Sequence, residues 1–179
     1  MIFATIGTQL PFDRLLTGLD TWAAHNPGVS IVAQTGSTRR SFRHLDTVTA
    51  MPQSEFRRHL LAARLVVAHA GMGSILSAVE LGKPVIIMPR LSKFGEHRND
   101  HQLDTSHEMS RLSNVVVTGN GEDLHAALDL ALARGFAVPP AAPTGTDACA
   151  PLLEALREFV WASHAVPEHA TLQAVRSAR

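Results

Sequence analysis

Hydrophobic and polar positions along this chain fall into blocks that predict strands and helices in alternation. Short apolar runs predict buried strands at residues 2–6, 29–33, 65–68, 85–88 and 115–118, with a weaker strand at 47–50. Between these runs, apolar residues recur at spacings of three and four, which predicts amphipathic helices over residues 12–25, 53–63, 75–81, 100–112 and 121–134. This alternation predicts an α/β fold with an open, mostly parallel sheet and helices on both of its faces.

Several polar or glycine-containing segments directly follow predicted strands. They are Gly7-Thr8-Gln9, Gln34-Thr35-Gly36, His69 to Ser74, and Arg90 to Asn99. Parallel strands end at one edge of the sheet, and ligands bind in the crevice beyond that edge. We therefore expect these segments to line one binding crevice. For Gly7-Thr8 taken alone, an ordinary strand-to-helix turn explains the sequence equally well.

The segment His69-Ala70-Gly71-Met72-Gly73-Ser74 carries the clearest chemistry. Glycines let a backbone approach a phosphate closely, and the N–H groups at a helix N-terminus favour an anion. Ser74 can add a hydroxyl donor or cap the helix, and a tight turn with an ordinary cap is the simpler alternative. The segment is not a dinucleotide fingerprint, because Leu76 replaces the third glycine, and Pro84 after Gly82-Lys83 excludes a P-loop.

A second polar segment runs from Gly95 to Gln102 and follows the strand that ends at Pro89-Arg90. Its convergent donors and acceptors suit a polar ligand such as a sugar. A solvated loop is the alternative, and so is a metal site built on His97 and His101 with His107 further along. No third ligand at a suitable spacing supports a metal, so we predict none.

Composition limits the class of protein. The chain has 179 residues, 45% of them hydrophobic, and a net charge of zero, so it lacks the basic surface of a nucleic-acid-binding protein. A single cysteine, Cys149, the absence of a signal-peptide pattern and the lack of a long apolar run predict a cytoplasmic protein. We predict a ligand-binding domain at 1–137, a Pro/Ala-rich linker at 138–148, and a helix with a tail at 149–179.

Taken together, these motifs resemble the carboxyl-terminal, donor-binding half of GT-B glycosyltransferases of family 28. The likeness covers about residues 1–134, and it rests on Gly7-Thr8 with Phe12-Asp13, His69 to Ile75, Gly82-Lys83-Pro84, Pro89-Arg90, and Gly95-Glu96-His97 with Asp100-His101-Gln102. Within the family, the chain is similar to the stand-alone subunits of the dolichol-linked N-acetylglucosaminyltransferase and of bacterial polysaccharide glucuronosyltransferases. The resemblance implies a Rossmann-like domain that forms a single GT-B half.

The resemblance also implies a UDP-sugar donor and its ligands. Gly71, Gly73 and Ser74 would meet the diphosphate, Asp100 to Gln102 the sugar, and Arg90 with Leu91 the uracil or ribose. Many relatives place a ribose-binding Glu where this chain has Ser77, so Ser77 and Glu80 are both candidates. The full set of predicted donor-binding residues is Gly7, Thr8, His69, Gly71, Met72, Gly73, Ser74, Ser77, Glu80, Arg90, Leu91, Glu96, His97, Asp100, His101 and Gln102.

The resemblance further implies that the acceptor half lies on a second, membrane-associated subunit, and that the site forms between the two. We expect transfer from UDP-glucuronate, UDP-glucose or UDP-N-acetylglucosamine to a lipid-linked saccharide in exopolysaccharide or capsule synthesis. No cofactor beyond the donor is expected, and backbone dipoles rather than a metal would stabilise the departing UDP. His69 is a candidate acid or base, although a structural histidine is the alternative. Two other functions remain open, a non-catalytic UDP-sugar-binding module and a related epimerase or hydrolase.

Overall fold

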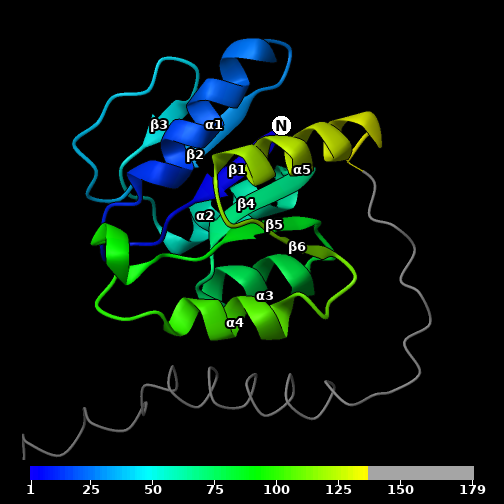
Figure 1. Cartoon of the computed structure of the whole chain (residues 1–179). Coiled ribbons are helices and arrows are strands. Elements are labelled where there is room, and N and C mark those ends of the chain that lie inside the picture. Colours follow the sequence, from blue (N-terminus) through cyan, green and yellow to red (C-terminus); the bar gives the residue numbers. More distant parts are fainter. Residues whose placement is uncertain (137–179) are drawn as a thin grey trace, which may run out of the picture. The chain divides into compact units, whose positions relative to one another are not determined.

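Residues 1–136 of a computed structural model are described, and they form one sheet of six strands (Figure 1). The strands are β1 (Ile2–Thr5), β2 (Ile31–Gln34), β3 (Asp46–Val48), β4 (Leu65–His69), β5 (Val85–Met88) and β6 (Val115–Val117). Every neighbouring pair is parallel, and the order across the sheet is β3-β2-β1-β4-β5-β6. The prediction of a parallel, Rossmann-like α/β sheet is confirmed.

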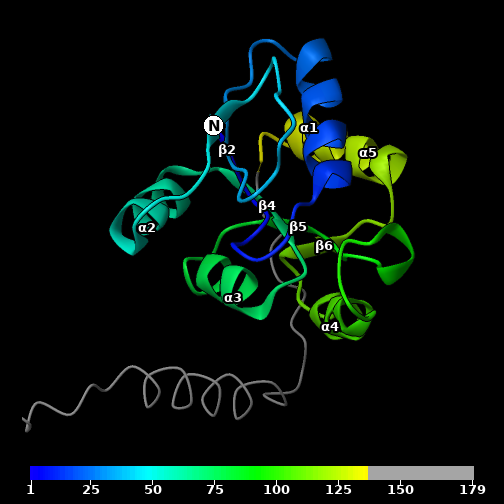
Figure 2. The same ribbon diagram turned by 90° about the vertical axis from the view of Figure 1, so that its left-hand side faces the viewer.

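Helices cover both faces of this sheet. They are α1 (Asp13–His25), α2 (Gln53–Ala62), α3 (Met72–Glu80), the 3-10 turn η1 (Ser92–Phe94), α4 (His101–Met109) and α5 (Gly121–Ala133). Figures 1 and 2 show α1 and α5 on one face and α2, α3 and α4 on the other. The predicted covering of both faces is therefore confirmed.

The core has two halves, one on each face, because successive strand residues point to opposite sides of the sheet. In β1, Ile2 and Ala4 pack under α1 and α5, whereas Phe3 packs under the helices of the other face. Strands that are buried on both faces read as continuous apolar runs, which is why β4 and β5 were recognisable from the sequence. Each fully buried Ile, Leu or Phe contributes roughly 1.5–3 kcal/mol to folding.

The sheet order fixes where a ligand crevice lies. Strands are added outward from β1 in one direction and from β4 in the other, so the order reverses between these two central neighbours. In open α/β sheets this reversal opens a crevice at the carboxyl ends of the two strands. Gly7 follows β1 and Gly71 follows β4, so both predicted glycine segments flank the reversal.

A few predicted boundaries are wrong. Strand β3 is Asp46–Val48 rather than 47–50, and α4 ends at Met109. Helix α3 starts at Met72 after an extended Gly71 as its N-cap, so Ser74 lies inside the first turn and does not cap the helix. The predicted linker at 138–148 and the helix and tail at 149–179 lie outside the described residues. Within residues 1–136 no helix is long and apolar enough to cross a membrane.

Candidate functional site

The imidazole of His69 lies between two glycine turns at the reversal of strand order. A Cβ added at Gly71 would lie 2.2 Å from Nε2 of His69, and one at Gly7 would lie 2.9 Å from its Cε1. Gly7 also has a φ of 73°, which side-chain-bearing residues rarely adopt. The turns after β1 and β4 can therefore close around this ring only if both positions are glycine.

The turn after β2 joins the same cluster. Gly36 has a φ of 55°, and a Cβ there would lie 3.0 Å from the carbonyl oxygen of Gly7. The buried Thr5 hydroxyl donates to Oε1 of Gln34 at 2.7 Å, which ties the ends of β1 and β2 together. The structure thus brings together the segments after β1, β2 and β4, and Arg90 joins the fourth predicted segment to them through the Ile6 carbonyl.

His69 is neutral at physiological pH. Burial and, to a smaller extent, the positive charge of Arg90 lower its pKa to about 4, and the nearby Thr5 backbone offsets part of this shift. Its Nδ1 is buried and has no hydrogen-bond partner in residues 1–136. A ring with this pKa brings no positive charge to a phosphate and is a weak general base near pH 7.

The first turn of α3 is open to an anion. No side chain caps this helix, and its first turn contains no acidic residue. A Cβ added at Gly73 would meet no atom within 4 Å, so the backbone is accessible there. The backbone N–H groups of Met72, Gly73 and Ser74 lie in the first turn, where they have no acceptor within the helix. The helix dipole adds a partial positive charge at the same end. This arrangement suits a phosphate group.

Arg90 is directed into the protein. Its guanidinium donates to the carbonyl oxygens of Ile6 and Leu10 at 2.6 Å each, of Pro11 at 2.7 Å, and of Glu96 at 3.1 Å. Burial lowers its pKa, while the carboxylate of Glu96 raises it. With these bonds, Arg90, which the resemblance places near the uracil or ribose, holds the β1–α1 loop against the end of β5.

Arg14 links three loops at the same edge. It forms a bidentate ion pair with the Glu96 carboxylate, with N–O distances of 2.9 and 2.8 Å. It also donates to the carbonyl oxygens of Pro89 and Gly119 at 2.8 Å each. Glu96 also accepts from the Leu91 N–H at 2.9 Å, so both carboxylate oxygens are engaged. No sequence pattern marks Arg14 as part of this edge, because its partners lie more than 70 residues away along the chain.

The Asp100 to Gln102 segment is held by its neighbours. Gln102 is buried and its Oε1 accepts from the Arg90 N–H at 3.0 Å. Asp100 accepts from the N–H of Ser92 at 2.7 Å and from its hydroxyl at 3.0 Å, and the first of these bonds is the main reason its pKa is lowered. His101 pairs with the Asn99 side chain.

The remaining predicted ligands have simpler surroundings. The rings of His97 and His101 meet edge to face with centroids 4.5 Å apart. In residues 1–136 no three His, Cys, Asp or Glu side chains are grouped as a metal site requires. Thr8 is exposed. The Ser77 hydroxyl donates to the carbonyl oxygen of Gly73 at 2.7 Å. Glu80 is the last residue of α3, so Ser77 lies about one turn nearer the N-terminus of the helix than Glu80 does.

Comparison with known proteins places this geometry in a family. A model of the glycosyltransferase family 28 C-terminal domain matches residues 12–137. The UDP-N-acetylglucosamine transferase subunit ALG13 of Yarrowia lipolytica is 26% identical over 141 residues, which are 69% of this chain and 67% of that protein.

Solved structures agree on the fold. An NMR solution structure of ALG13 superposes with a TM-score of 0.57 at 18% identity, covering 87% of this chain and 93% of that one. A crystal structure of the glycotransferase of kitacinnamycin gives a TM-score of 0.53 at 20% identity, covering 89% of this chain. The chain spans 39% of the length of that glycotransferase, as one GT-B half is expected to. The match over residues 12–137 confirms the resemblance, and the chain belongs to the glycosyltransferase family 28 C-terminal domain family.

Proposed function

We propose that this chain is the donor-binding, catalytic subunit of a two-component glycosyltransferase that uses a UDP-sugar. Family membership supports the reaction class, and the named relative is a subunit of a UDP-N-acetylglucosamine transferase. The single observation that carries the proposal is the cluster at the strand reversal. There the His69 ring fits between Gly7 and Gly71, and the uncapped end of α3 begins immediately after it.

The diphosphate of the donor would bind the first turn of α3. As the bond from the sugar to UDP breaks, negative charge grows on the leaving diphosphate. The N–H groups of Met72, Gly73 and Ser74 are already oriented toward that position, so they stabilise the charge without reorganisation. Arg90 and Arg14 would not contact the diphosphate. They bond Ile6 and Glu96 and so hold the surrounding loops in place.

The acceptor half of the site would come from a second subunit. The neutral, weakly basic His69 supports this division, since the reaction needs a base whose pKa lies closer to 7. We propose that the partner is membrane-associated, that it presents a lipid-linked saccharide, and that it recruits this chain to the inner face of the membrane. Exopolysaccharide or capsule assembly is the proposed setting, with UDP-glucuronate, UDP-glucose or UDP-N-acetylglucosamine as donor.

Isothermal titration calorimetry of the full chain with UDP, the three UDP-sugars and NAD tests the proposal. We expect heat from UDP and from one UDP-sugar, and none from NAD. Heat from NAD alone would overturn it. Transfer that appears only when a membrane partner is added supports a two-component enzyme, whereas binding without transfer alongside that partner identifies a non-catalytic module.

A further inference from the structure

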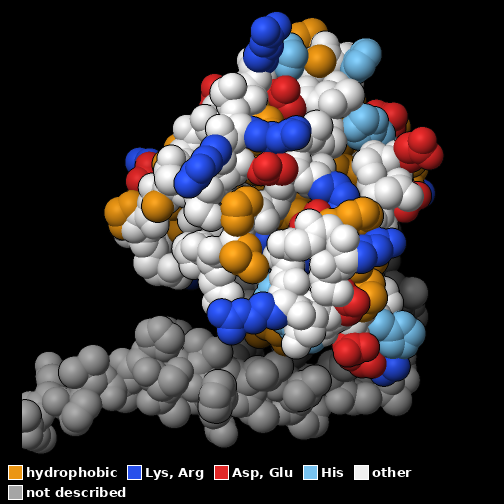
Figure 3. Space-filling view, turned by 60° about the vertical axis from the view of Figure 1, so that its left-hand side comes forward, with side chains coloured by type: hydrophobic (Ala, Val, Ile, Leu, Met, Phe, Trp, Pro, Cys, Tyr) orange, Lys and Arg blue, Asp and Glu red, His pale blue; other side chains and the backbone are white. Residues whose placement is uncertain are grey.

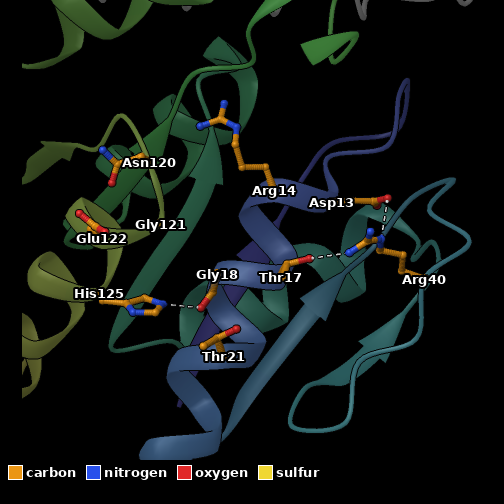
Figure 4. A pocket seen from close by; sticks show the side chains of 10 residues that line it. All are labelled: Asp13, Arg14, Thr17, Gly18, Thr21, Arg40, Asn120, Gly121, Glu122 and His125. Carbon is orange, nitrogen blue, oxygen red and sulfur yellow. Dashed lines mark hydrogen bonds and ion pairs between the residues drawn. The ribbon is translucent and has the colours of Figure 1, made fainter.

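Arg14 joins the first helix to loops that are distant in the sequence. It lies in the first turn of α1, and Figure 4 shows its side chain pointing away from Thr17 and Thr21, which line the groove between α1 and α5. The guanidinium reaches the carboxyl edge of the sheet instead, where it contacts the end of β5 and the turn after β6. One side chain of α1 therefore extends to the edge at which the donor is proposed to bind.

Every N–H group of this guanidinium has a partner. Nε and Nη2 donate to the two carboxylate oxygens of Glu96, and Nη2 also donates to the Pro89 carbonyl. Nη1 donates to the Gly119 carbonyl at 2.8 Å and to Sδ of Met88 at 3.1 Å. A guanidinium has five N–H donors in a fixed plane, and these five bonds use all of them. Arg14 therefore has no donor left for a ligand, so its effect on a ligand passes through the loops that it holds.

The ion pair of Arg14 and Glu96 is enclosed, unlike ion pairs of the molecular surface. Its side chains are 20% and 9% exposed, whereas those of Arg111 and Glu108 are 63% and 56% exposed. Figure 3 shows several Lys and Arg side chains that are exposed in the latter way on one face of the molecule. A surface pair adds little to stability, whereas removal of one partner of an enclosed pair leaves a charge without its counterion. The conformation of the loop that carries Glu96 therefore depends on Arg14.

Glu96 passes this constraint to the whole β5–α4 loop. Its carboxylate also accepts from the Leu91 N–H at 2.9 Å, and its carbonyl oxygen accepts from the Arg90 guanidinium at 3.1 Å. The backbone N–H of Arg90 donates to Oε1 of Gln102, in the first turn of α4, at 3.0 Å. The beginning of the loop, its middle and the start of α4 thus belong to one network that includes Arg14.

The β5–α4 loop lies beside the turn that is proposed to bind the diphosphate. Strands β4 and β5 are neighbours, with His69 paired to Met88, and the Ala70 N–H donates to the Met88 carbonyl at 3.1 Å. The β4–α3 turn and the β5–α4 loop therefore leave the sheet side by side. Arg98 and Asn99 of the loop are exposed polar residues. The loop can therefore offer polar groups to a sugar that is attached to a diphosphate at the start of α3.

We propose that Arg14 is a positioning residue for the sugar of the donor. By bonding Glu96 and Pro89, it holds the β5–α4 loop in the conformation that contacts the sugar, and it does not touch the ligand itself. When Arg14 is replaced, contacts with the sugar are lost in addition to any change in the binding of UDP. The identity of the ligand rests on the proposed function, whereas the dependence of the loop on Arg14 does not.

Isothermal titration calorimetry of the full chain with UDP, UDP-glucuronate, UDP-glucose and UDP-N-acetylglucosamine tests this role. The quantity to compare is the ratio of the dissociation constant of UDP to that of the UDP-sugar that binds most tightly. Arg14→Met keeps the aliphatic stem and removes all five bonds. The ratio should fall at least about tenfold, which is the effect of losing one hydrogen bond to a charged group. A smaller change in the ratio, with or without a loss of UDP affinity, would overturn the positioning role.

Lys83→Met is the matched control at the opposite edge of the sheet. Nζ of Lys83 donates to the carbonyl oxygens of Leu61 and Ala63 at 2.7 and 2.8 Å, so this variant also removes bonds from a cation to the backbone. It should destabilise the fold and leave the ratio unchanged. An equal fall of the ratio in both variants would mean that general destabilisation is the cause, and the positioning role would be wrong.

Two further variants test the link between Arg14 and Glu96. Arg14→Lys keeps the charge but has three N–H donors and cannot form the bidentate pair, so it should fold and still lower the ratio. Glu96→Gln should lower the ratio as Arg14→Met does, and the double variant should lower it no further, because the two side chains act as one unit. Additive effects would contradict that unit.

The same titrations separate this role from the proposed function. A wild-type chain that binds neither UDP nor any UDP-sugar would overturn the proposed function. A wild-type chain that binds UDP but no UDP-sugar would overturn only the positioning of a sugar by Arg14.

Discussion

Two strand-to-helix turns lie at the same edge of the sheet. They differ in whether their own side chains bond the free N–H groups at the start of the helix. The β6–α5 turn (Thr118–Asp123) is internally satisfied, since Asn120 accepts from the Asp123 N–H at 2.9 Å and Asp123 accepts from the Gly119 N–H at 3.1 Å. The β4–α3 turn (His69–Ser74) has no side-chain cap. One helix start is thus closed by its own side chains, while the other is left open.

The two turns also differ in charge and in space. The first turn of α5 contains Glu122 and Asp123, which already match the positive end of the helix dipole. The first turn of α3 contains no acidic residue, and the unpartnered Nδ1 of His69 lies just before it. Helices α1, α2 and α4 also lack a side-chain cap, but of the five described α-helices only α3 has no acidic residue in its first turn. Its N-terminus at the strand reversal therefore keeps a positive end of the helix dipole that no side chain of its own first turn neutralises.

The largest expected effect comes from placing a carboxylate at the open turn. Gly73→Asp should weaken UDP binding at least about 100-fold, because two charges 4 Å apart repel by about 4 kcal/mol at an effective dielectric constant of 20. Without ligand, the same carboxylate should favour the helix N-terminus and raise stability by roughly 0.3–1 kcal/mol. Calorimetry with UDP measures the loss of affinity, and thermal unfolding without ligand measures the gain in stability.

Gly121→Asp is the matched control at the closed turn. A Cβ at Gly121, like one at Gly73, meets no atom within 4 Å. This variant should leave UDP affinity unchanged. If both variants lose UDP binding equally, the difference between the two turns has no bearing on the donor site.

The second prediction concerns how His69, at the start of the β4–α3 turn, makes the stability of the protein depend on pH. Its pKa is about 4 in the folded protein and near 6.5 when unfolded, so between these values the unfolded chain binds the extra proton. Stability from this residue is complete above pH 6.5 and falls by about 3 kcal/mol as the pH drops to 4, at 1.36 kcal/mol per pKa unit. Urea unfolding at several pH values between 7 and 4 measures it.

His69→Gln should flatten that profile, since glutamine does not titrate. Thr118, the counterpart of His69 in the β6–α5 turn, is also uncharged, and its hydroxyl donates to the Ile87 carbonyl at 3.2 Å. Thr118→Val should therefore keep the wild-type slope between pH 6.5 and 4. A wild-type slope in His69→Gln would show that other groups cause the loss.

Much of this comparison was readable from the sequence. The apolar runs of β4 and β5 and the glycines of the β4–α3 turn are local signals, and the carboxyl-edge rule brought distant segments together. Gly7 and Gly71 were predicted to lie near each other, and the structure places both against His69. Local patterns of this kind suffice when a parallel sheet fixes the position of every strand end.

The internal roles of charged residues were not readable. Arg90 and Glu96 look the same in the sequence whether they contact a ligand or the backbone, because either use requires a polar residue at that point in the loop. Only the fold shows that Arg90 bonds four carbonyl groups and that Glu96 pairs with Arg14, 82 residues away. The capping role of Ser74 failed for a related reason, since the helix begins three residues earlier than its apolar pattern suggested.

A third prediction separates the two glycines of the open turn. Gly71→Ala would place a methyl group 2.2 Å from the His69 ring, which Gly7 blocks on its other side, so it should cost roughly 1–3 kcal/mol of stability. Gly73→Ala has free space and replaces a helical glycine, so it should be neutral or stabilising by up to about 1 kcal/mol. Chemical denaturation ranks the two, and equal costs would contradict the packing of His69 between the turns.

The smallest effect belongs to the closed turn. Asn120→Ala removes the side-chain cap of α5 and should lower stability by about 1 kcal/mol, because the Asp123 N–H loses its acceptor. UDP affinity should not change. Ser74→Ala is the matched variant in α3, and since Ser74 caps nothing, its stability should stay within about 0.5 kcal/mol of wild type while UDP binding weakens. Asn120→Ala would then change only the stability, and Ser74→Ala would change only the UDP affinity. A stability loss in Ser74→Ala equal to that of Asn120→Ala would mean that α3 is capped after all and that its first turn is not reserved for a ligand.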